Sequence, residues 1–244
     1  MKSLHVIVFV GLSIIAYAQV DEIKSASADN SSNSGRENRG SPGSGGGFFF
    51  DVFVQVGQCQ GAKLQSDRSR YPSMVSLDLM LQGAVKPSSY YMLWPRIRGN
   101  WGLFSTDFRM NYLIEDDVDG YKHIRTNDWQ IVQLNLITSK YIMFRFGTGL
   151  MTEAFESRRR FNETSFMFDV HAPDQTKVIA FEYRFAKDWN TGVNPRREFS
   201  VQYQHQFMSA GALHSYISAG VTYQKYYGTI EVWGMQGGIL FRIF

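Results

Sequence analysis

The chain ends in Gly237-Gly238-Ile239-Leu240-Phe241-Arg242-Ile243-Phe244, so its last residue is aromatic. Every second residue from Ile239 onward is apolar, whereas Gln236 and Arg242 fall on the opposite face of an extended chain. A period of two residues is typical of a β-strand with one apolar and one polar face. The sequence therefore predicts a final strand that meets two different environments.

The same alternation recurs upstream, and the sequence predicts ten strands in all. They span residues 48–57, 73–82, 103–114, 128–138, 140–150, 161–171, 177–187, 197–207, 213–223 and 229–244. Residues 83–95 form the weakest point of the count, because Leu93-Trp94-Pro95 also fits a longer third strand. Eight or twelve strands remain open for this reason.

The apolar faces of these strands consist mostly of Phe, Tyr, Leu, Ile and Val, with polar and charged residues opposite. A soluble lipocalin-like barrel would need its apolar face inside, and a small barrel has little interior room for so many aromatic side chains. Lipid sets no such limit on volume. We therefore expect the apolar face to meet a membrane, with aromatic residues at the rims. The rim candidates are Trp94, Trp101, Trp129, Tyr226 and Tyr227.

The amino-terminal region indicates export. Lys2 precedes an apolar run at residues 6–16, and Ala16-Tyr17-Ala18 is an A-x-A cleavage site, so we expect a signal peptide at residues 1–18. Residues 19–47 are rich in Ser, Gly, Asn and charge, and they predict a flexible periplasmic tether. Residues 48–244 are then the barrel domain.

An exported all-β chain with a terminal aromatic strand resembles Gram-negative outer-membrane β-barrel proteins. The resemblance covers residues 48–244 and implies a closed antiparallel transmembrane up-and-down β-barrel of the outer membrane, with both chain ends in the periplasm. It also implies short inner turns and longer outer loops, the latter at residues 60–72, 115–127, 152–160, 188–195 and 224–228. The final segment resembles the insertion signal read by the barrel-assembly machinery, and its residues here are Gly238, Phe241 and Phe244.

With the apolar face toward lipid, charged residues of both signs point into the lumen. About ten strands enclose an interior that side chains largely fill, so we expect these groups to form a structural network of ion pairs rather than line an open pore. The network residues are Asp51, Asp78, Asp107, Arg109, Arg145, Glu163, Asp169, Glu182, Arg184 and Glu198, with Arg242 beside them.

Other partners and cofactors receive little support. The net charge of +3 is spread along the chain, which argues against nucleic-acid binding. Cys59 is the only cysteine, so an internal disulfide is excluded. Arg158-Arg159-Arg160 ends an expected outer loop, and arginine binds phosphate bidentately, so these residues are candidates for lipopolysaccharide phosphate contact.

No catalytic, cofactor-binding or metal-ligating set stands out. Small barrels that modify lipid A need a nucleophile within reach of a base. His171 and His214 fall at expected inner ends, His205 on the lipid face and His123 in an outer loop. The acidic run at residues 115–120 lacks the distal glutamate of an EF-hand.

Three functions follow in order of preference. The first is a non-catalytic barrel, structural or an accessory subunit of an outer-membrane assembly, with outer-membrane lipid, lipopolysaccharide and an unidentified membrane protein as partners. The second is a narrow channel for ions or small solutes. The third is a lipid A-modifying barrel enzyme.

Overall fold

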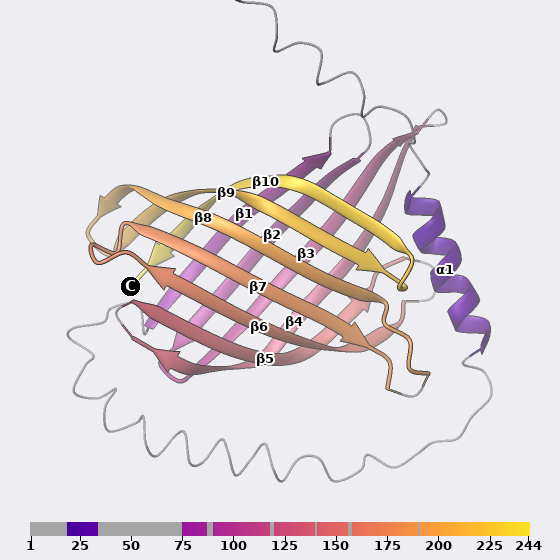
Figure 1. Ribbon diagram of the computed structural model, residues 1–244, viewed down its shortest axis with the longest axis horizontal. Helices are drawn as coiled ribbons and strands as arrows, with labels where there is room; N and C mark the ends of the chain where they lie inside the picture. Colours follow the sequence, from indigo (N-terminus) through magenta and orange to yellow (C-terminus); the bar gives the residue numbers. More distant parts are fainter. Residues whose placement is uncertain are drawn as a thin grey trace, which may run out of the picture.

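A computed structural model describes residues 19–33, 75–86, 90–117, 120–139, 141–155, 158–189 and 191–244. Within these ranges one helix and ten strands are present (Figure 1). The elements are α1 (Gln19–Asn33), β1 (Val75–Lys86), β2 (Tyr90–Trp101), β3 (Phe104–Asp117), β4 (Gly120–Thr138), β5 (Ile142–Glu153), β6 (Arg160–His171), β7 (Lys177–Lys187), β8 (Arg196–Ala210), β9 (Leu213–Tyr226) and β10 (Ile230–Ile243).

Each strand pairs antiparallel with the next, and β1 pairs with β10 to close the barrel. The predicted all-β, closed up-and-down barrel of ten strands is confirmed. Leu77 lies opposite Ile243 and Val85 opposite Met235, so β1 begins at the end of the barrel that holds Phe244. We call this the C-terminal end and its opposite the far end.

The ten strands are not the ten that the sequence predicted. The predicted strand at 48–57 lies outside the described residues. Of the stretch 83–95, predicted as an inner turn, residues 83–86 instead end β1 and residues 90–95 begin β2, a strand the sequence analysis missed. Pro95 explains the error, because proline cannot donate to a strand ladder and argues against a strand interior. The pairing of β2 with β3 accordingly skips Trp94 and Pro95 and resumes in the same register at Arg96.

Two further expectations need correction. Residues 115–127, predicted as a long outer loop, belong mostly to β3 and β4, which pair as far as Asp117 and Gly120. Residues 19–33, predicted as part of a flexible tether, form α1, which lies against the far end of the barrel (Figure 1). The rest of the expected tether, residues 34–47, lies outside the described residues.

Burial alternates along the strands, as in β1, where every second side chain is buried. The buried set is mainly polar, and the exposed set is mainly apolar and aromatic. Trp101 and Trp129 face outward with 57% and 51% of their surface exposed, whereas Trp94 and Tyr226 are only 2% exposed and face inward. The rim placement predicted for Trp94 and Tyr226 is therefore wrong. No described helix is long and apolar enough to cross a membrane.

Candidate functional site

The middle of the lumen is filled by ten charged side chains, which we call the central charge network. Its members come from β2, β3, β4, β6, β7 and β8, and none exposes more than 7% of its surface. Five guanidinium groups face five carboxylates, so their formal charges cancel. The members are Arg96, Arg98, Arg109, Arg184, Arg196, Asp107, Asp128, Glu163, Glu182 and Glu198.

Asp107 is the centre of one half of this network. It accepts hydrogen bonds from Arg184 at 2.6 Å, from Arg96 through Nε at 2.8 Å, and from Arg98 at 3.4 Å. Arg96 also reaches Glu182 across the lumen at 2.7 Å, and Arg184 pairs with the same carboxylate. Asp107 thus binds three arginines from two strands, β2 and β7.

Arg109 and Arg196 organise the other half. Both donate to Asp128, at 2.8 Å and 2.6 Å. Arg109 also binds Glu198 at 2.5 Å, and Arg196 binds Glu163 at 2.8 Å. An ion pair of 3.4 Å between Arg184 and Glu163 links the two halves.

This arrangement closes the lumen. Buried charges are tolerated only when paired and hydrogen-bonded, and here each charge faces a partner on another strand. Uncharged side chains satisfy further oxygens: Gln130 donates to Glu163 and Gln224 to Glu198. The groups that would attract ions in an open pore are thus engaged with one another.

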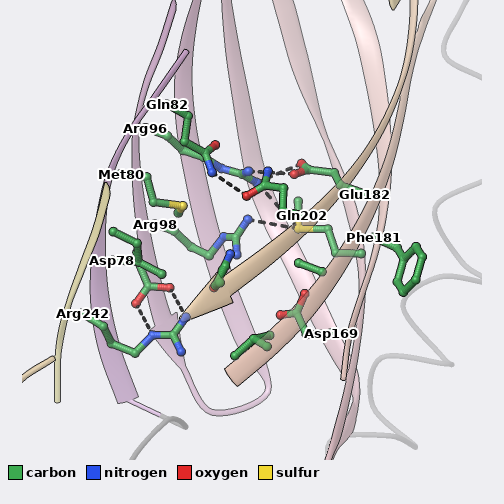
Figure 2. A pocket seen from close by; sticks show the side chains of 15 residues that line it. Asp78, Met80, Gln82, Arg96, Arg98, Asp169, Phe181, Glu182, Gln202 and Arg242 are labelled. Atoms are coloured by element: carbon green, nitrogen blue, oxygen red, sulfur yellow. Dashed lines mark hydrogen bonds and ion pairs between the residues drawn. The ribbon is translucent and has the colours of Figure 1, made fainter. Parts of the chain in front are cut away.

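A second, smaller set of ion pairs lies toward the C-terminal end. Arg242 binds Asp78 through two hydrogen bonds of 2.8 and 2.9 Å, and Arg145 lies 2.9 Å from Asp169. Figure 2 shows the side chains that line a small cavity here, with Asp78, Arg242 and Asp169 on one side and Arg96, Arg98 and Glu182 of the central charge network on the other. Its volume of about 30 Å³ holds only one or two water molecules.

Helix α1 covers the far end of the lumen. Val20 and Ile23 are fully buried in an apolar cluster with interior residues such as Tyr90 and Trp94. This apolar cluster joins α1 to the interior of the barrel. Its members are Val20, Ile23, Ala84, Tyr90, Met92, Trp94, Leu113, Ile124, Tyr226, Ile230 and Val232.

Polar contacts hold α1 at its middle. Ser27 donates to Glu153 at 3.0 Å, and Arg159 donates to the Ser27 carbonyl at 2.6 Å. Tyr227, in the turn between β9 and β10, donates to Glu153. Burial, with the Glu153 carboxylate beside it, raises the pKa of the Tyr227 hydroxyl well above its ordinary value. Tyr227 therefore keeps its proton, and its hydrogen bond to Glu153, above the pH at which a free tyrosine ionises.

The structure places nine of the ten predicted lumen residues inside the barrel, each at most 8% exposed, and Asp51 lies outside the described residues. Six belong to the central charge network, and Asp78, Arg145 and Asp169 to the pairs near the C-terminal end. Sequence reasoning missed Arg96, Arg98, Asp128 and Arg196. Alternation around Pro95 was the available signal for the two arginines of β2.

The three arginines at 158–160 do not form one surface. Arg159 turns inward onto α1 and stacks near Phe161, with its guanidinium carbon 5.3 Å from the ring centre. Arg158 and Arg160 are exposed at the far end. The phosphate contact of these three arginines stays a prediction, with Arg159 engaged by α1 in this structure.

The predicted insertion-signal residues lie on and beside β10. Gly238 sits opposite Gln82 in the closing seam, where an added Cβ would come within 2.5 Å of the Leu81 carbonyl oxygen. Phe241 points outward with 40% of its surface exposed. The Phe244 amide donates to the Ala212 carbonyl at 3.0 Å, and its ring meets His214 edge-on at 4.8 Å.

Three of the described histidines have different surroundings. His171 is buried in the lumen, His205 stacks on Tyr203 at the outer surface, and His214 contacts Phe244. Among the described residues, no group of His, Cys, Asp and Glu has an arrangement that could hold a metal ion. Comparison of the sequence with protein-family models and with curated proteins found no match.

Proposed function

We propose that this chain is a barrel of the outer membrane of a Gram-negative bacterium with a non-catalytic role, as a structural protein or an accessory subunit of a larger assembly. The observation that carries this proposal is the charge-paired interior: the central charge network crosses the lumen, and the cavity beside it has a volume of about 30 Å³. Such an interior is suited to rigidity rather than transport.

The outer surface supports a membrane location. Outward residues of the middle section are mostly aliphatic or aromatic, as in β8 and β9 with Phe199, Tyr203, Ile217 and Val221. Outward charges occur toward the two ends, such as Arg197 at the far end and Lys177 at the C-terminal end. In water, a barrel with this outer surface would expose a single apolar patch far larger than soluble proteins tolerate. An apolar band between polar ends matches the cross-section of a bilayer.

A search for a protein partner and a conductance measurement test the proposed non-catalytic role. Affinity purification from gently solubilised outer membranes should recover the barrel with a stoichiometric membrane protein, and the purified barrel should give no single-channel current in a planar bilayer. A stable current from the wild-type chain would overturn the non-conducting role. Altered lipid A in a deletion strain would instead favour an enzyme.

A further inference from the structure

Glu115 stands at the far end of β3, inside the mouth that α1 covers, and only 4% of its surface is exposed. Its two oxygens accept the backbone N–H groups of Gln19, at 3.1 Å, and Val20, at 3.0 Å. Among the described residues Glu115 forms no ion pair, and its cross-strand neighbour Lys122 binds Asp21 at 2.5 Å. A buried carboxylate is thus met by the first two amides of a helix.

A buried carboxylate is costly unless a positive group faces it. The amides at a helix amino terminus supply part of that charge. The sequence predicts that the leader is removed after Ala18, which makes Gln19 the first residue of the mature chain. The nitrogen 3.1 Å from Glu115 would then belong to a free α-amino group.

We propose that Glu115 is a receptor for the α-ammonium group of Gln19, and that this ion pair locks α1 into the far mouth of the barrel. The proposal rests on the expected cleavage after Ala18. In that hydrolysis, carried out by a leader peptidase, the hydroxyl of water goes to the Ala18 carbonyl carbon. Its hydrogen goes to the Gln19 nitrogen, which takes up one more proton at neutral pH.

The remaining contacts of α1 place its amino terminus at this point. Val20 and Ile23 are fully buried below the helix, and Ser27 is fixed by Glu153 and Arg159 one turn further on. The helix cannot slide along its axis without exposing both apolar side chains. Its first nitrogen is therefore held beside Glu115 by the rest of the helix.

The test compares the same mature chain with a charged and with an uncharged amino terminus. The full mature chain is purified with a free Gln19, verified by mass spectrometry, and a second sample is converted to pyroglutamate before refolding. In that conversion the α-amino nitrogen attacks the Gln19 side-chain carbonyl carbon and ammonia leaves, so the positive charge is lost. Hydrogen exchange of the peptide at residues 19–33 should become at least about tenfold faster in the cyclised form.

Variants complete a double-mutant cycle. Glu115→Gln with a free Gln19 should speed exchange of α1 to a similar degree, and cyclisation should then add little. Glu231→Gln is the control, because its side chain binds Lys225 at the outer surface. Its contact with the Gln19 side chain is made by the backbone carbonyl, which the substitution keeps. Equal exchange in the free and cyclised wild-type chains would overturn the proposal. A mature chain that begins elsewhere than at Gln19 would do the same.

Discussion

Asp107 accepts hydrogen bonds from three guanidinium groups, and its surface is fully buried. We expect Asp107→Asn to keep the side-chain volume but to remove the negative charge that these three arginines share. Breaking a buried pair in this way costs about 3–5 kcal/mol of folding free energy, which denaturant unfolding in lipid or detergent would measure. Asp174→Asn lies in an exposed turn, where the residue accepts two hydrogen bonds from Thr176. It should cost at most about 1 kcal/mol, because asparagine keeps one acceptor oxygen. Equal stability of the two variants would contradict the central role given to Asp107.

Substitution of two neighbouring glycines in β10 tests the pairing of β1 with β10 that closes the barrel. A Cβ at Gly238 would lie 2.5 Å from the Leu81 carbonyl oxygen and 2.8 Å from the Gln82 Cα, both backbone atoms that cannot turn aside. At Gly237 the nearest atom would be the Ser218 carbonyl oxygen at an ordinary 3.6 Å. Gly238→Ala should therefore lower the yield of closed, heat-resistant barrel on a gel, whereas Gly237→Ala should not. Similar yields would show that β1 and β10 meet differently.

Single residues also show where sequence reasoning stops. Alternation assigned Asp107, Glu163 and Glu182 to the lumen because a strand has only two faces. It could not tell which acid meets which arginine, because partners such as Arg96 and Glu182 come from strands that face each other across the lumen. Those pairs depend on strand stagger, which the sequence pattern leaves open.

At the scale of elements, β2 and α1 are what the sequence analysis missed. Proline hid β2, although residues around Pro95 alternate as they do in the other strands. Residues 19–33 contain few apolar side chains, and a helix of this length is marginal in water on its own. Burial of Val20 and Ile23 against the far end of the barrel supplies the stability that local helix propensity does not provide. A helix that is stable only when it packs against the barrel cannot be predicted from the composition of its own residues.

The carboxyl end of β10 gives a prediction at the same scale. Phe244 bonds the Ala212 carbonyl through its amide and places its ring against His214, so it ties the last strand to the turn between β8 and β9. We expect deletion of Phe244 to reduce the amount of folded barrel in the outer membrane. Phe207→Ala removes another exposed aromatic, on β8, without changing the end of β10, and it should assemble normally. Normal assembly without Phe244 would count against an insertion signal.

At the scale of the whole molecule, α1 and the start of β1 lie at opposite ends of the barrel. The placement of both chain ends in the periplasm stays a prediction, and it can be tested because α1 and Phe244 lie at opposite ends of the barrel. If the barrel spans a membrane as we propose, α1 and the turn at Gly211–Ala212 lie on opposite sides of that membrane.

Cysteine labelling checks this sidedness. In a Cys59→Ser background, Glu22→Cys on α1 and Ala212→Cys at the C-terminal end are both exposed positions. We expect an impermeant maleimide to label only Glu22→Cys in intact cells, and both after the membrane is permeabilised. Equal labelling of the two in intact cells would show that α1 does not occupy the far end across a membrane.

The most direct test of a polar-cored barrel that spans lipid uses the tryptophans, of which the chain has five. Variants that retain a single tryptophan, the others being replaced by phenylalanine, are reconstituted with phospholipids brominated on the acyl chain, which quench fluorescence on contact. Trp101 and Trp129 face outward, whereas Trp94 is buried in the lumen and donates to Asn111 at 2.6 Å. The account predicts strong quenching of Trp101 and Trp129 and little of Trp94. Absence of quenching at all three, or quenching of Trp94 alone, would contradict it.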